Sequence, residues 1–315
     1  MGIKHFFMWF RNQFPEHIYK LDNSDTLESK DIHIDNLMID MNGLFHNAAQ
    51  KVYEYGNFKP NQRLMSMRKK VITPCIKTQK LLFQEVCKNI DELIKVVQPS
   101  KRLILCVDGT APLSKQNQQR QRRFRSAIES SSPEGFDSNC ITPGTKFMDY
   151  LTKYIDWYIR KKISTEEKWQ NIEIIFSNEK APGEGEFKIL QYIRFYGDPN
   201  DTFCINGMDA DLIMLCLGTH IPKFYILRED MYNSYNKYFC LNIGDVHQHL
   251  AELMRWESTN YEFIPKSAIN DFIFLCFMVG NDFLPHIPSI EIIENGIELI
   301  LEIYREVGAS YGHIT

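Results

Sequence analysis

The sequence lacks the patterns that mark several common protein classes. Its eight cysteines include no pair at CxxC spacing and no Cys/His tract with zinc-finger spacing. Several cysteines sit inside apolar runs, which is typical of buried, reduced thiols and indicates a reducing compartment. The N-terminus carries no secretory signal pattern, and no stretch approaches the ~20 apolar residues of a membrane span. We therefore expect a cytoplasmic chain with no membrane association.

Positive charge is also scarce. Lys and Arg number 36 against 40 Asp and Glu, so the formal net charge is −4. A simple nucleic-acid-binding protein would be basic, so a nucleic-acid partner would have to be held by a local patch. Repeats, low-complexity tracts and long linkers are absent, and hydrophobic residues make up 44% of the chain, enough for a sizeable core.

Short apolar runs alternate with helical patterns along most of the chain. We predict strands at 37–41, 103–107, 172–176, 203–205 and 224–227, with helices between them at 78–97, 114–130, 145–162, 184–196 and 210–218. This alternation predicts an α/β fold with a mostly parallel central sheet flanked by helices. The segments 245–256, 267–279 and 289–306 have helical patterns only, so we expect a C-terminal helical layer packed beside the sheet.

Carboxylates recur where the predicted strands end. In open parallel sheets the working site lies beyond the carboxyl ends of the strands, so these side chains should gather at one edge. The set comprises Asp40, Asp108, Glu184, Glu186, Asp209 and Asp211. Each of these acids could instead be an ordinary helix cap, because Asp and Glu favour first turns.

Six carboxylates at one edge would repel one another unless cations neutralise them. Oxygen ligands without Cys or His select Mg²⁺ or Mn²⁺ over zinc. Two such ions ~4 Å apart can activate a water and stabilise the leaving oxygen in phosphodiester hydrolysis. The paired acids at 184/186 and 209/211 can converge if their segment is extended or is a turn that enters a helix, and Pro182-Gly183 and Asn206-Gly207 supply turns. Asp282 is a further acid, after an apolar helix, although such an Asp is commonly a turn residue.

Residues 115–125 form a basic segment with almost no apolar side chain. Lys115, Gln119, Arg122 and Arg123 are spaced by offsets of 0, 4, 7 and 8, which places them on one helical face. One lysine, one amide and two arginines on a stripe suit a terminal phosphate, since arginine can bind it in a bidentate manner. The alternative is a solvated helix face.

Motifs that run in order through the whole chain resemble the XRN family of 5′-to-3′ exoribonucleases. They lie at 1–7, 39–47, 107–112, 117–125, 138–145, 181–186, 207–215 and 279–285, and include Ile39-Asp40-Met41-Asn42-Gly43 and Ala181-Pro182-Gly183-Glu184-Gly185-Glu186. Any single motif is weakly specific, whereas the ordered set is highly specific.

The resemblance implies a PIN-like, 5′-nuclease fold and processive hydrolysis of single-stranded RNA that carries a 5′ monophosphate. It implies a catalytic centre with two Mg²⁺ ions, replaceable by Mn²⁺, and a 5′-phosphate site at Lys115, Gln119, Arg122 and Arg123. His46 resembles the family residue that stacks on the 5′-terminal base. The implied metal-binding and catalytic residues are Asp40, Asp108, Glu184, Glu186, Asp209, Asp211 and Asp282.

Two departures from the family pattern bear on the organisation of the chain. The segment between 229 and 271 has no zinc knuckle, so the chain resembles the cytoplasmic branch. The second conserved region of the family is missing, so we expect one N-terminal nuclease domain over 1–315, with its sheet core at about 1–230 and a helical part at about 240–306. The alternatives are an RNA-binding or scaffold remnant that is inactive by itself, and a flap-type 5′ endonuclease.

Overall fold

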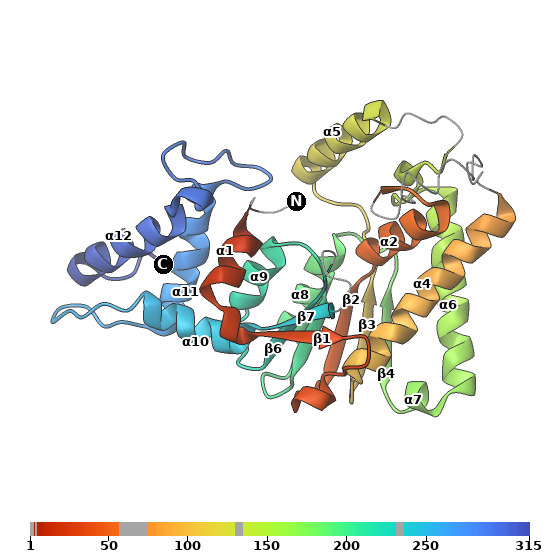
Figure 1. The fold of residues 1–315 in the computed structure, drawn as a ribbon, viewed down its shortest axis with the longest axis horizontal. Coiled ribbons are helices and arrows are strands. Elements are labelled where there is room, and N and C mark those ends of the chain that lie inside the picture. The colour runs from red at the N-terminus through yellow and green to blue at the C-terminus, as the bar shows by residue number, and fades with distance from the viewer. Residues whose placement is uncertain (1–2, 4, 57–74, 130–134, 231–235) are drawn as a thin grey trace. The chain divides into compact units, whose positions relative to one another are not determined.

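The computed structural model describes residues 3, 5–56, 75–129, 135–230 and 236–315, so Met1 and Gly2 of the first motif lie outside the described residues. The chain divides into two units (Figure 1). Unit 1 consists of Met1–Asp25 and Tyr192–Thr315, and unit 2 is Thr26–Gln191. The chain therefore passes from unit 1 into unit 2 and back again.

The sheet of unit 2 consists of three parallel strands. They are β2 (Asn36–Asp40), β3 (Arg102–Cys106) and β4 (Glu173–Ser177), in that spatial order. Apolar side chains such as Leu37 and Leu103 are fully buried, as expected for parallel strands covered on both faces. Asp40 is opposite Cys106, which is in turn opposite Ser177, so all three strands end at one edge.

Helices follow each of these strands. They are α2 (Met41–Tyr53), α4 (Ile76–Val97), α5 (Leu113–Glu129), α6 (Lys146–Thr165), α7 (Glu167–Gln170) and α8 (Gly185–Tyr196), with short 3-10 turns at Glu28–Lys30 and Ser138–Cys140. Helix α4 buries Leu82, Val86 and Ile90, which recur every four residues, and it packs beside α6 (Figure 1). The predicted helices 78–97, 114–130 and 145–162 agree with α4, α5 and α6, while α2 was not predicted.

The sheet of unit 1 mixes strand directions. Its spatial order is β1 (Ile18–Asp22), β7 (Asn236–Asn242), β6 (Phe224–Glu229) and β5 (Phe203–Asn206). Strands β5 and β6 are parallel, whereas β7 pairs antiparallel with both β6 and β1. The expected α/β class with mostly parallel strands is confirmed, but β1 and β7 were not predicted.

Five α-helices and three 3-10 turns complete unit 1 among its described residues. They are α1 (Phe6–Gln13), α9 (Asp211–Leu217), α10 (Ile243–Leu253), α11 (Pro265–Leu275) and α12 (Gly296–Tyr311), with turns at Pro15–His17, Cys276–Val279 and Ile292–Glu294. Trp9 of α1 stacks on Phe272 of α11 with ring centroids 6.0 Å apart. The predicted start of the last helix at 289 is wrong, because Asn295 has a φ of 62° and α12 begins only after it.

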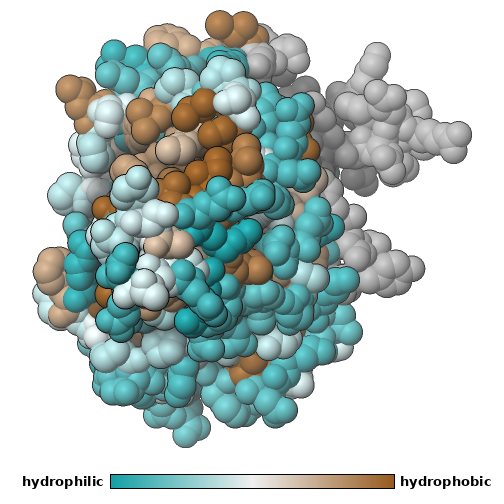
Figure 2. Space-filling view, turned by 90° about the vertical axis from the view of Figure 1, so that its left-hand side faces the viewer, coloured by the Kyte–Doolittle hydropathy of each residue, from teal (hydrophilic) through white to brown (hydrophobic). Residues whose placement is uncertain are grey.

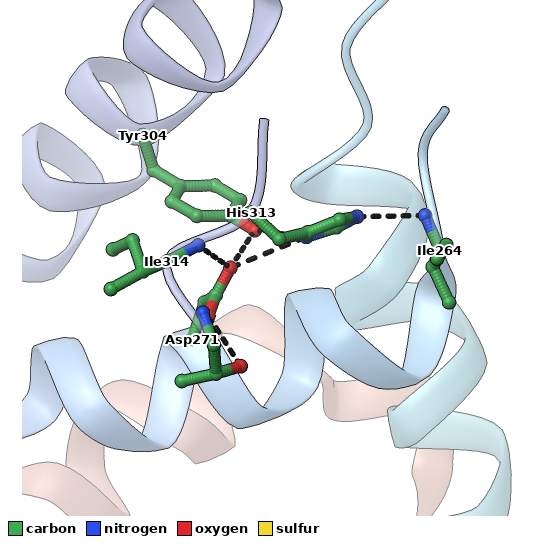
Figure 3. Close-up of polar contacts among 6 residues, drawn as sticks. Ile264, Asp271, Tyr304, His313 and Ile314 are labelled. Carbon is green, nitrogen blue, oxygen red and sulfur yellow. Dashed lines mark hydrogen bonds and ion pairs between the residues drawn. The ribbon is translucent and has the colours of Figure 1, made fainter. Parts of the chain in front are cut away.

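The C-terminal residues of unit 1 are fastened to a buried carboxylate (Figure 3). Asp271 on α11 has no exposed surface, and its oxygens accept hydrogen bonds from the Tyr304 hydroxyl at 2.6 Å and from the backbone N–H groups of Ile314 and Thr315 at 3.0 and 2.8 Å. Burial alone would raise the pKa of Asp271, but these donors outweigh it and lower that pKa. Protein hydrogen-bond donors, and not water, therefore stabilise the ionised form of this carboxylate.

One face of unit 1 exposes apolar side chains (Figure 2). Helix α12 exposes Leu299, Ile303 and Val307 while it buries Ile300 and Tyr304 on its other side. The apolar side chains of α12 therefore extend around the helix instead of being confined to its inward face. Among the described residues, no helix is both long enough and apolar enough to cross a membrane.

All eight cysteines are free thiols, and six of them are buried. The prediction of buried thiols is wrong for Cys75, which is exposed at the start of α4, and Cys140 is half-buried. Cys75 is the N-cap residue of α4, and its N–H donates a hydrogen bond to Thr78 Oγ1 at 2.9 Å, so this cysteine lies at the helix start and not in the core.

Candidate active site

Two predicted acids of unit 2 are coupled through one asparagine. Asp40 ends β2 and accepts a hydrogen bond from the Asn42 N–H at 3.3 Å. The Asn42 amide donates to Asp108 Oδ2 at 2.8 Å, and its own oxygen accepts from the Asp108 N–H at 3.1 Å. Asn42 therefore fixes both the backbone and the carboxylate of Asp108 relative to the end of β2.

The turn that carries Glu184 and Glu186 meets the same two acids. The Gly185 N–H donates to Asp108 Oδ1 at 2.6 Å, and a Cβ at position 185 would lie 2.6 Å from Asp40 Oδ1. Only glycine permits this approach. The structure thus brings Asp40, Asp108 and the 184–186 turn together, with Glu184 buried and Glu186 half-buried in the first turn of α8.

Positive charge lies near Asp108, yet the pKa of this acid is raised. Burial raises the pKa of Asp108 despite the opposing effects of the Gly185 N–H, Lys188, Lys115 and Arg122. Lys115 Nζ lies 3.4 Å from Glu184 Oε1. A cation bound at this position would stabilise the ionised form of Asp108. The all-oxygen donor set fits a hard divalent cation.

Lys188 holds the strand ends in place. Its side chain is 8% exposed, and its ammonium donates to the carbonyls of Val107 at 2.7 Å and Asn178 at 2.9 Å. Burial lowers the pKa of Lys188, opposed by Asp108 and other groups. This lysine ties the residue after β3 to the residue after β4, which keeps Asp108 at the sheet edge.

The predicted acids of unit 1 lie in two separate turns. Asp209 is exposed after β5, and the half-buried Asp211 begins α9. Asp282 is half-buried in the turn after Val279, whose shape is fixed by Asn281 because its side-chain oxygen accepts the N–H groups of Phe283 and Leu284 at 2.9 Å. Asp282 therefore lies in a turn, as its sequence context indicated.

A buried arginine accompanies the first of these turns. Arg228 is 7% exposed, its guanidinium carbon lies 4.0 Å from the centre of the Phe7 ring, and its Nη1 donates to the Asp209 carbonyl at 3.0 Å. Burial lowers the pKa of Arg228 to about 10, against the attraction of Asp209 and Asp211. Arg228 therefore stays charged at neutral pH and holds the backbone of the turn.

The basic stripe on α5 borders a cavity of unit 2. Gln119, Arg122 and Arg123 line a space of about 340 Å³, together with His46 and Asp108. Lys115 is not among the lining residues and pairs with Glu184 instead. The lining of the cavity thus combines two arginines with the carboxylate of Asp108.

His46 contributes an uncharged ring to this cavity. Burial, followed by the charge of Arg122, lowers the pKa of His46 to about 4. The ring is therefore a neutral imidazole at neutral pH, which suits stacking on a base better than pairing with a phosphate.

Sequence reasoning missed several residues that shape the site. Asn42, Lys188 and Arg228 position acids, and Asn139, Thr142 and Pro143 complete the cavity wall. Lys188 was detectable as a single lysine within the apolar helix start Phe187-Lys188-Ile189-Leu190. The roles of Asn42 and Arg228 depend on partners elsewhere in the chain and leave no local signal.

Curated relatives match nearly the whole chain. It is 35% identical to 5′-3′ exoribonuclease 1 of Schizosaccharomyces pombe, covering 99% of this chain and 24% of that protein. It is 34% identical to 5′-3′ exoribonuclease 1 of Saccharomyces cerevisiae, covering 97% and 21%. A 5′-3′ exoribonuclease 2 homolog of Caenorhabditis elegans is 31% identical, covering 98% and 38%. The chain thus spans well under half the length of these relatives.

Solved structures resemble the backbone in part. The catalytic core of Rad2 in complex with DNA substrate superposes with a TM-score of 0.49 and 16% identity, covering 96% of this chain and 69% of that one.

The profile described as XRN 5′-3′ exonuclease N-terminus matches residues 1–230, and the Xrn1 helical domain profile matches residues 262–315. Because the first profile matches most of its length, the chain belongs to the XRN 5′-3′ exonuclease family.

Proposed function

We propose that the chain is a 5′-to-3′ exoribonuclease that hydrolyses single-stranded RNA with a 5′ monophosphate, releasing mononucleotides. Family membership supports the nuclease chemistry. The observation that carries the end specificity is the cavity shared by Asp108, His46, Gln119, Arg122 and Arg123. It combines phosphate-binding arginines with a carboxylate of the candidate metal centre, as an enzyme that cuts next to a bound terminus requires.

The cofactor in this proposal is a pair of Mg²⁺ ions, which Mn²⁺ could replace. When bound, the ions would supply a water of lowered pKa and stabilise the leaving oxygen. The raised pKa of Asp108 and the all-oxygen donor set support this assignment. The residues proposed to hold the ions are Asp40, Asp108, Glu184, Glu186, Asp209, Asp211 and Asp282.

The remaining residues would bind and orient the RNA. Arg122 and Arg123 would bind the terminal phosphate, with Arg123 oriented by the hydrogen bond from its Nη2 to Gln119 Oε1 at 3.3 Å. Lys115, paired with Glu184, would join the phosphate and metal sites electrostatically. The neutral ring of His46 would stack on the first base without selecting its sequence.

The test is a gel series with matched RNAs that differ only at the 5′ end, incubated with Mg²⁺. Loss of one charge-assisted contact costs about 1.5–3 kcal/mol, so a 5′ hydroxyl should be cut roughly 10- to 100-fold more slowly than a monophosphate. Capped ends should resist. The double variant Arg122→Ala/Arg123→Ala should flatten this order, whereas Arg125→Ala, which removes an exposed charge from the same helix, should preserve it.

Other results would replace the proposal. Equal rates on monophosphate and hydroxyl ends, or internal products appearing first, would indicate a flap-type endonuclease. Binding of RNA without hydrolysis in Mg²⁺ or Mn²⁺ would indicate an RNA-binding or scaffold role for this chain alone.

His46 can be tested separately. One stacking contact is worth ~1–3 kcal/mol, so His46→Ala should lower the rate about 5- to 100-fold at subsaturating RNA. His46→Phe should retain most of the rate, because a neutral ring is preserved. Because the pKa of His46 is about 4, the contribution of the ring should not change between pH 6 and 8. Unchanged kinetics for His46→Ala would remove His46 from the site.

We propose a cytoplasmic location for this function. The eight free thiols support a reducing compartment. Imaging of the tagged chain in its host, with a nuclear marker beside it, tests the location directly.

A further inference from the structure

A cluster of nitrogen and oxygen ligands lies in unit 1, away from the sequence motifs that define the nuclease. Glu16 and His17 belong to the 3-10 turn Pro15–His17 that precedes β1, and His249 lies on α10. His17 and His249 are separated by 232 residues in the chain, yet His17 Nε2 and His249 Nδ1 are 3.1 Å apart. Glu16 Oε1 lies 3.5 Å from the first nitrogen and 3.0 Å from the second.

Hydrogen bonds cannot account for all three contacts at once. Each imidazole nitrogen has one in-plane position, which holds either a proton or a lone pair. If both nitrogens carry protons, both can point at Glu16 Oε1, but the two donors then lie 3.1 Å apart with no hydrogen bond between them. If only one carries a proton, at least one nitrogen turns its lone pair toward another lone pair. A cation between the three atoms would accept all three lone pairs together.

The spacing of the three atoms matches that of a tetrahedral metal site. Zinc binds His nitrogen at ~2.0–2.1 Å and carboxylate oxygen at similar length, so its ligands are about 3.3 Å apart. The three observed separations, 3.0, 3.1 and 3.5 Å, bracket this value. Two imidazoles and one carboxylate select zinc and its transition-metal neighbours over Mg²⁺, which prefers oxygen ligands.

The surroundings hold the ligands in place and leave them accessible. The buried ring of Phe14 packs edge-on against His249, with centroids 5.2 Å apart, and lies 6.4 Å from that of His17. The side chains of Glu16, His17 and His249 are 51%, 18% and 36% exposed. All three line a cavity of about 860 Å³ whose wall also includes Asp245 and Glu252, so a fourth, solvent-derived ligand has room.

We propose that Glu16, His17 and His249 form a zinc site with three protein ligands and one open position. The bound ion joins the turn before β1 to helix α10, with 232 residues of sequence separation between His17 and His249. Such a clip removes more chain entropy from the unfolded state than one between near neighbours. The site is independent of the proposed nuclease centre, because its ligands are none of the acids assigned there.

The test uses the whole chain, stripped with EDTA and returned to buffer with excess Mg²⁺ to occupy carboxylate sites. Titration with Co²⁺ should give the visible absorption bands of a tetrahedral site, saturating at one ion per chain, and Zn²⁺ should abolish them. Glu16→Gln, His17→Gln and His249→Gln should weaken Co²⁺ binding by at least about 100-fold. His33→Gln, which changes an exposed histidine of unit 2, should bind like the wild type.

Two further readouts separate ligation from simple damage to the fold. His249→Cys keeps a zinc-binding atom, so it should retain one ion and add a thiolate-to-Co²⁺ charge-transfer band. Zn²⁺ should raise the Tm of the wild type and of His33→Gln, but not that of His17→Gln. If the wild type takes up no stoichiometric Co²⁺ or Zn²⁺ in excess Mg²⁺, or if the Gln variants bind as well as it does, the site does not exist.

Discussion

Unit 1 and unit 2 each contain an aspartate of shifted pKa, and the two carboxylates are solvated differently: Asp271 is fully buried, whereas Asp108 is half-buried. Asp271 of unit 1 accepts hydrogen bonds from a tyrosine hydroxyl and two backbone N–H groups, and its pKa is lowered. Asp108 of unit 2 accepts from Gly185 and Asn42, and its pKa is raised. A buried acid whose donors suffice is a structural ion, whereas one whose donors fall short is suited to receive a cation.

The strongest way to break this comparison is to neutralise Asp108. Asp108→Asn keeps the shape of the side chain but removes the charge proposed to hold metal, so hydrolysis of 5′-monophosphate RNA should fall about 10³-fold, or ~4 kcal/mol. The fold should survive, since the amide oxygen can still accept from Gly185 and only the Asn42 side chain loses its acceptor. Asp156→Asn is the matched control, because Asp156 is a half-buried acid on α6 that pairs with Arg160 and has no contact with the described residues of the proposed site. Full activity of Asp108→Asn in Mg²⁺ would remove Asp108 from the metal centre.

The second prediction concerns the structural ion. Asp271→Ala leaves the Tyr304 hydroxyl and the C-terminal N–H groups without their acceptor, so the free energy of unfolding should fall by about 3 kcal/mol. Tyr304→Phe removes one donor only and should cost about 1 kcal/mol. Urea unfolding followed by tryptophan fluorescence measures both, because the Trp256 ring packs 5.2 Å from that of Tyr304 and 4.5 Å from that of His313.

The activity of the Asp271 variants tests whether this aspartate affects stability alone. At a temperature where Asp271→Ala remains folded, its rate on RNA per folded molecule should match the wild type. A stable Asp271→Ala protein with a large loss of hydrolysis would reverse the roles given to the two aspartates.

Local patterns in the sequence predicted what depends on neighbouring residues. The offsets of 4, 7 and 8 on α5 anticipate that Gln119, Arg122 and Arg123 face one cavity, because helix periodicity alone fixes their direction. Asp40 and Asp108 could be placed at one edge, since parallel strands end together. The phosphate-binding and metal-binding roles themselves stay predictions.

Other features depend on partners far along the chain and could not be predicted. Asp271 appears as an acid within an apolar helix, and the donors that explain it, Tyr304 and the backbone of residues 314–315, lie more than 30 residues further along the chain. Strands β1 and β7 stabilise each other by antiparallel pairing although neither has a long apolar run. The contact of His17 with His249 joins two unremarkable local sequences. Sequence patterns therefore predict local geometry well, whereas they do not predict polar contacts between distant residues.

The smallest expected effect is the pH dependence of the stability that Asp271 and Asp108 contribute, measured without metal. Asp271 has a lowered pKa, so its stabilising contribution is present above the ordinary aspartate value of ~3.9 and is lost as the pH falls through the lowered value. Asp108 has a raised pKa, so the folded state prefers its protonated form and loses stability as the pH rises from ~3.9 through the raised value. The two aspartates should therefore give pH profiles of opposite slope.

The measurement is the Tm in EDTA from pH 3 to 8 for the wild type, Asp108→Asn and Asp271→Asn, taken as differences from the wild type so that other titrating groups cancel. The advantage of the wild type over Asp271→Asn should shrink toward the acid end. The Tm of the wild type should fall relative to that of Asp108→Asn as the pH rises. This change should be smaller than the effect of Asp271→Ala on stability. Mg²⁺ should restore the wild type at pH 7 and leave Asp108→Asn little changed, because the cation supplies the charge that the donors of Asp108 lack. Parallel profiles for the two variants would mean that the donors around the two carboxylates do not distinguish a structural ion from a metal ligand.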